Sequence, residues 1–97
     1  MPQHKLTTDE IDKHLQELPG WRVENDTLIK QFEFATFVKA IEFVNILAES
    51  AEEIQHHPDI DIRYNKVTVG LSTHDAGGLT VLDTDFAASA DTTADAL

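Results

Sequence analysis

Residues 59–72 read DIDIRYNKVTVGLS, and the fold prediction starts from this stretch. Apolar residues stand at every second position on both sides of Tyr64-Asn65. They are Ile60, Ile62, Val67, Val69 and Leu71. A period of two is typical of strands with one buried face, and Tyr64-Asn65 can form the turn between them. The stretch therefore predicts a β-hairpin that is buried on one side.

A long amphipathic helix is predicted just before this hairpin, over about residues 36–53. One apolar stripe would contain Phe37, Val38, Ile41, Val44 and Ala48. Phe43, Ile46 and Leu47 lie off that stripe. A helix that is apolar on two sides needs two partners, here its own sheet and a second subunit, unless it has a single wider buried face. The sequence leaves both interpretations open.

A shorter helix and a second hairpin are predicted at the start of the chain. Thr7 and Glu10 have the spacing of a capping box, and Pro19-Gly20 ends the helix. Two strands should follow, over about residues 21–24 and 28–34, and Asn25-Asp26 has the composition of the turn between them.

The last predicted helix begins at Thr80, where Asp83 completes a second capping box. Its inward side should carry Leu82, Phe86, Ala87 and Ala90. The small, acidic end of the chain is expected to fray from about residue 91. The element order is α-β-β-α-β-β-α. We therefore expect a single α+β domain over residues 1–97, in which three helices pack on one face of a four-stranded antiparallel sheet.

Composition limits the classes of function. The 97 residues include 18 acidic and 7 basic residues, for a net charge of −11, which disfavours direct binding to nucleic acid. The chain has no cysteine, no apolar N-terminal signal segment and no apolar run near the roughly 20 residues of a membrane helix. We expect a soluble cytoplasmic protein. The acidity fits either an ordinary cytosol or a high-salt cytoplasm, in which repulsion between the charges is screened.

Three histidines form the candidate site. His56 and His57 follow the long helix, and His74 follows the second hairpin. Because a hairpin returns the chain to its starting edge, His74 can lie near the His56-His57 pair. Glu52 stands four residues before His56 and could hold its imidazole. Acid–base catalysis, a zinc site and a purely structural role all remain open. Asp83 has a capping role and could also line the cleft.

These residues resemble the pterin-4a-carbinolamine dehydratase family. The resemblance rests on Glu52 followed by His56-His57-Pro58, on the segment LSTHDAGGLT at residues 71–80, and on Asp83. It implies a four-stranded antiparallel sheet backed by three helices, and dimers that can pair into tetramers. It also implies a hydro-lyase that removes water from a 4a-hydroxytetrahydropterin during tetrahydrobiopterin recycling. No metal or redox cofactor is implied.

The resemblance also suggests a role for each site residue. His57 would be the principal acid/base, His56 would assist it, and His74 would bind the pterin and support proton transfer. The substrate-binding set would be Glu52, Pro58, Ser72, Thr73 and Asp83. The chain departs from animal members at Ile60, where they commonly carry an aromatic residue, and at Leu82, where they carry arginine. These departures bear on which pterin side chain is preferred.

Two other roles are compatible with the sequence. Animal members of the family also bind a transcription factor through helices, and Phe43, Ile46 and Leu47 would form the corresponding contact surface in an interaction module. A place in molybdopterin metabolism is the second alternative.

Overall fold

The hairpin at residues 59–72 forms as predicted. In a computed structural model, which describes residues 4–97, β3 (Asp59–Arg63) pairs antiparallel with β4 (Lys66–Leu71). Tyr64 adopts a positive φ of 52° in the turn between them. Val67, Val69 and Leu71 of β4 are fully buried and form the centre of the core, whereas on the edge strand β3 Ile60 is only partly buried and Ile62 is 40% exposed.

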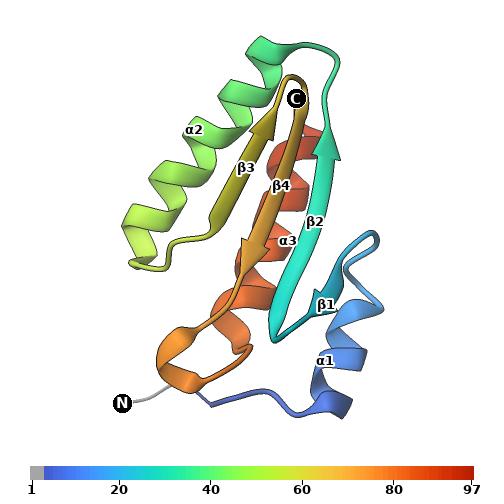
Figure 1. Ribbon diagram of the computed structural model, residues 1–97, viewed down its shortest axis with the longest axis vertical. Helices are drawn as coiled ribbons and strands as arrows, with labels where there is room; N and C mark the ends of the chain where they lie inside the picture. Colours follow the sequence, from blue (N-terminus) through green and yellow to red (C-terminus); the bar gives the residue numbers. More distant parts are fainter. Residues whose placement is uncertain (1–3) are drawn as a thin grey trace.

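The first hairpin pairs with the second to complete the sheet. β1 (Arg22–Glu24) and β2 (Thr27–Glu33) are joined by Asn25 and Asp26, both at positive φ, which is the turn geometry that suits a two-residue hairpin loop. β2 also pairs antiparallel with β4, with Phe32 opposite Val67. The strand order is therefore β1-β2-β4-β3, and β1 and β3 form the two edges (Figure 1).

Three helices cover the apolar face of this sheet: α1 (Thr8–Leu15), α2 (Phe37–Ile54) and α3 (Val81–Asp95). The Thr7–Glu10 and Thr80–Asp83 capping boxes are both present. Phe43 and Leu47 of α2 pack with Phe86 and Ala87 of α3 in one core cluster with β4. The predicted fold class and element order are confirmed. Among residues 4–97, no helix combines the length and the apolar character needed to cross a membrane.

The buried face of α2 differs from the predicted stripe. The residues in the core are Ala40, Phe43, Leu47 and Ala51. Phe37 and Val38 are instead 48% and 64% exposed. Two of the four buried residues are alanines, which add little to a hydrophobic pattern although they let the helix lie close to the sheet. Since Phe43 and Leu47 are buried, they cannot provide the partner surface considered from the sequence.

The end of α3 is held in place by contacts with the first hairpin. Asp91 accepts hydrogen bonds from Trp21 Nε1 at 3.0 Å and from Lys30 Nζ at 2.8 Å. Ala90 is fully buried one position earlier. The helix continues to Asp95, beyond the point at which we expected the chain to fray.

Candidate active site

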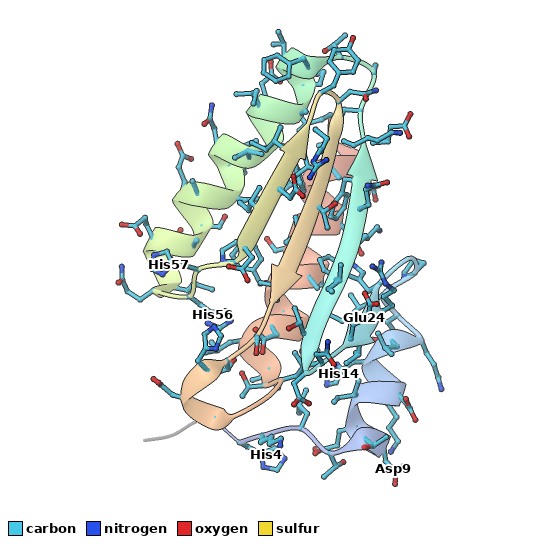
Figure 2. The ribbon with its side chains drawn as sticks, viewed as in Figure 1. His4, Asp9, His14, Glu24, His56 and His57 are labelled. Carbon is cyan, nitrogen blue, oxygen red and sulfur yellow. The ribbon has the colours of Figure 1, made fainter. Side chains whose placement is uncertain are left out.

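An open pocket lies where the C-terminal end of α2 meets the loop after β4. Its volume is about 240 Å³, and three imidazoles lie in its wall. The full lining is Gln55, His56, His57, Ser72, Thr73, His74 and Asp75. His56 lies between the end of α2 and the loop that follows β4, whereas His57 lies beside the last turn of the helix (Figure 2). The hairpin thus brings the three histidines together, as the sequence predicted.

The helix end sets the directions of the two adjacent histidines. α2 stops at Ile54 because Gln55 adopts a left-handed conformation, with φ 53° and ψ 45°. The N–H groups of Gln55 and His56 both bond back to the carbonyl of Ala51. Left-handed residues commonly end helices in this way, and they turn the chain sharply. His56 is consequently buried while His57 is exposed.

His56 pairs with a buried carboxylate on α3. Its Nε2 lies 2.6 Å from Oδ1 of Asp83. The exposed fraction is 8% for His56 and zero for Asp83. A charged or polar pair at this depth is stable only when its hydrogen bonds are satisfied, so the second carboxylate oxygen of Asp83 also needs hydrogen-bond donors.

The second oxygen of Asp83 completes a buried network. Oδ2 accepts hydrogen bonds from Thr73 Oγ1 at 2.8 Å and from the backbone N–H of Thr80 at 3.0 Å. The hydroxyls of Thr73 and Thr80 are themselves 2.9 Å apart. Asp83 therefore caps α3, as the sequence predicted, and contacts His56 with the same carboxylate, although it does not line the pocket itself.

His57 pairs with Glu52, which the sequence had assigned to His56. Nε2 of His57 lies 2.6 Å from Oε2 of Glu52, and both side chains are exposed. The assignment to His56 was wrong because it assumed that the helix continues through residue 56. The left-handed Gln55 ends the helix first and brings the next imidazole back beside Glu52.

His74 reaches the pocket from a short 3₁₀ helix, His74–Ala76, and not from a strand. β4 ends at Leu71, and an isolated bridge between Thr73 and Gly78 closes the loop around this helix. His74 is exposed. Its ring makes no hydrogen bond to the protein in the part of the chain that the structure describes, so it is available to a ligand.

The other predicted site residues divide into two groups. Ser72 and Thr73 line the pocket, whereas Glu52, Pro58 and Asp83 lie outside its wall. Glu52 contacts the pocket through His57, and Asp83 contacts it through His56 and Thr73. Gln55 and Asp75 line the pocket but were not singled out from the sequence, although each is adjacent to a candidate histidine. Across residues 4–97, no group of three or more histidine or acidic side chains is arranged to hold a metal ion.

Comparisons with known proteins agree on one family. The chain matches the family model described as Pterin 4 alpha carbinolamine dehydratase over residues 4–93. A protein of Picosynechococcus sp. named "Putative pterin-4-alpha-carbinolamine dehydratase" is 51% identical over 90% of this chain and 95% of its own. A protein of Acidobacterium capsulatum with the same name is 52% identical over 88% of this chain and 92% of its own.

Solved structures show the same relationship. A transcriptional coactivator/pterin dehydratase from Brucella melitensis superposes with a TM-score of 0.91 at 33% identity, covering 94% of this chain and 99% of its own. A pterin dehydratase-like protein, identified as a RuBisCO assembly factor in the alpha-carboxysome, gives a TM-score of 0.64 at 29% identity. That match covers 76% of this chain and 86% of the other.

Proposed function

Because this chain belongs to the pterin-4a-carbinolamine dehydratase family, we propose that it removes water from a 4a-hydroxytetrahydropterin by histidine acid–base catalysis. The product is a quinonoid dihydropterin, and the pathway served is tetrahydrobiopterin recycling in the cytoplasm. The observation that carries this proposal is the convergence of His56, His57 and His74 on one pocket.

The reaction needs two proton transfers at neighbouring atoms of the pterin. The C4a–O bond breaks, and the hydroxyl leaves as water once a proton reaches its oxygen. The adjacent ring nitrogen, N5, forms a double bond to C4a and loses its proton. One imidazolium to donate and one neutral imidazole to accept are sufficient, and histidine serves in both roles near neutral pH.

The three imidazoles differ in their surroundings, and this supports different roles. His57 is exposed beside Glu52, so it can exchange protons with both substrate and solvent, which suits the principal acid/base. His56 is held rigidly by Asp83 and would accept the second proton. His74, with Ser72 and Thr73, lines the pocket from the segment that follows β4 and would contact the pterin ring.

A kinetic comparison tests this proposal. The protein is mixed with freshly generated 4a-hydroxytetrahydropterin, and formation of the quinonoid product is followed by absorbance. We expect acceleration by the wild type and a loss of about 10²-fold or more when His56 and His57 are both replaced by alanine. His14→Ala, on α1 and outside this pocket, is the matched control. A double variant as fast as the wild type would contradict the assignment of the two histidines.

We also propose that the chain forms a homodimer or homotetramer. β3 is an edge strand, and Phe37, Val38 and Ile54 of α2 are exposed apolar side chains. Unpaired strand edges and apolar surface both favour association between copies. Light scattering after size exclusion should give a mass of two or four times 10.8 kDa. A monomeric mass at micromolar concentration would contradict this proposal.

A further inference from the structure

The hydrogen-bond directions around Asp83 determine which nitrogen of His56 can do chemistry. Oδ2 of Asp83 is occupied by Thr73 Oγ1 and by the Thr80 N–H, and a backbone N–H can only donate. The Thr73 hydroxyl can accept from the Thr80 hydroxyl, which leaves its own proton for Asp83. Oδ1 is then left for Nε2 of His56, and an ionised carboxylate can only accept. Nε2 therefore carries the proton.

The other ring nitrogen of His56 faces solvent. Nδ1 makes no hydrogen bond to the protein in residues 4–97. In this same part of the chain, no buried side-chain nitrogen or oxygen lacks a hydrogen-bond partner. Nδ1 must therefore reach solvent, and His56 is one of the residues that line the pocket. Its lone pair is available there to accept a proton.

We infer that Asp83 is a positioning residue, which keeps the proton of His56 on Nε2 so that Nδ1 is the atom that exchanges a proton with the pterin. This inference rests on the proposed function. As the C4a–O bond breaks, its electron pair leaves with the hydroxyl. The hydroxyl takes a proton from the imidazolium of another histidine and becomes water. The N5 lone pair forms the C4a=N5 bond, and the N5 proton passes to Nδ1. Both imidazoles recover their starting states by proton exchange with solvent.

The geometry makes Asp83→Asn an informative substitution. The Thr80 N–H needs an acceptor, so the amide oxygen of the asparagine must take the place of Oδ2. Its NH₂ group then replaces Oδ1 and donates to Nε2 of His56. The imidazole is forced to carry its proton on Nδ1, which removes the lone pair from the pocket. The helix cap and the size of the side chain are both kept.

Nitrogen-15 NMR of the full chain reads the tautomer directly. Two-bond ¹H–¹⁵N spectra at about pH 8.5, where an ordinary imidazole is neutral, separate an Nε2–H ring from an Nδ1–H ring. His56→Gln identifies the signals of His56, because its amide can still donate to Asp83. We expect the Nε2–H form in the wild type and the Nδ1–H form in Asp83→Asn. The kcat of Asp83→Asn should fall by about 10²-fold or more with a smaller change in KM.

The same spectra and kinetics test a control variant and the outcomes that would contradict the inference. Asp85→Asn makes the same chemical change at an exposed position of α3 and should leave tautomer and kcat unchanged. An Nδ1–H ring of His56 in the wild type would overturn the inference, and this measurement does not depend on whether Asp83→Asn folds. An Asp83→Asn variant that keeps the Nε2–H ring yet loses activity would also overturn it. Absence of dehydratase activity in the wild type would contradict the proposed function, whereas the tautomers are read without any substrate.

Discussion

Asp91 offers a quantitative test of how the C-terminal helix is held. Its carboxylate accepts from Trp21 Nε1 at 3.0 and 3.1 Å and from Lys30 Nζ at 2.8 Å. Lys30 also donates to the carbonyl of Pro19, so one cluster joins α3, β2 and the turn between α1 and β1. Asp91→Ala removes the acceptor that the other groups share.

The expected loss of stability follows from the burial of these groups. Trp21 is buried, and a hydrogen bond to a charged acceptor contributes about 1.5–3 kcal/mol. The side chains of Lys30 and Asp91 are 21% and 20% exposed, so their ion pair adds at most about 1 kcal/mol after screening by solvent. We therefore expect the free energy of unfolding to fall by about 2–4 kcal/mol. A loss of ~2 kcal/mol corresponds to a decrease in Tm of about 8–16 °C in a domain of this size.

Urea unfolding measures this loss, and Trp21 provides the signal because it is the only tryptophan in the chain. Asp95→Ala is the matched control, since it removes an exposed carboxylate one turn further along α3. Its free energy of unfolding should stay within about 0.5 kcal/mol of the wild type. An Asp91→Ala variant as stable as Asp95→Ala would refute the reasoning and would favour a chain that frays from about residue 91.

Three further predictions concern the core, the charge and the first capping box. Phe43→Ala should destabilise the protein by about 3–5 kcal/mol, whereas Phe37→Ala should cost under about 1 kcal/mol. Equal losses of stability in chemical unfolding would contradict the observed buried face of α2. The Tm should rise between 0.01 and 1 M NaCl, because salt screens repulsion within a chain of net charge −11; a constant Tm in calorimetry would count against that self-repulsion. The pKa of Glu10 is lowered from 4.5 to about 2. The largest cause is the hydrogen bond that its carboxylate accepts from the backbone N–H of Thr7, and the second is the hydrogen bond with the His4 side chain. A lowered pKa stabilises the fold above pH 4.5, and this contribution disappears as the pH falls through about 2. Glu10→Ala should therefore have a lower Tm than the wild type at neutral pH, and a gap that does not shrink in acid would argue against this role.

Local signals in the sequence predicted most of the fold. Both capping boxes, both two-residue turns and the period of β4 depend on residues close together in the chain, and each is present in the structure. The buried face of α2 was predicted wrongly because that helix has apolar residues on more than one side. Only the position of the sheet determines that Phe43 is buried and Phe37 is exposed, and that position depends on contacts distant in sequence.

The three histidines, Ser72 and Thr73 of the candidate site were predicted from the sequence, but the partners of the imidazoles were not. Spacing along a regular helix placed Glu52 next to His56. A single left-handed residue, Gln55, changed the partner to His57. The actual partner of His56 is Asp83, which is 27 residues away, and no local pattern identifies such a contact. Whether the predicted site residues act in catalysis stays a prediction until the kinetic and NMR experiments are done.

The shared carboxylate of Asp83 also couples ligand binding to the folding of α3. The same oxygen that accepts from Thr73 in the pocket wall holds the first amide of the helix cap, so local opening of α3 must disrupt the pocket. By linkage, a ligand that binds only the intact pocket stabilises that helix against opening, by about 2.7 kcal/mol at a concentration 100 times its Kd. Hydrogen exchange at the start of α3 should therefore slow when the pocket is occupied, although those amides do not line it. A fragment of this chain that ends before Thr80 would lack the acceptor of His56 and could not assemble the same site.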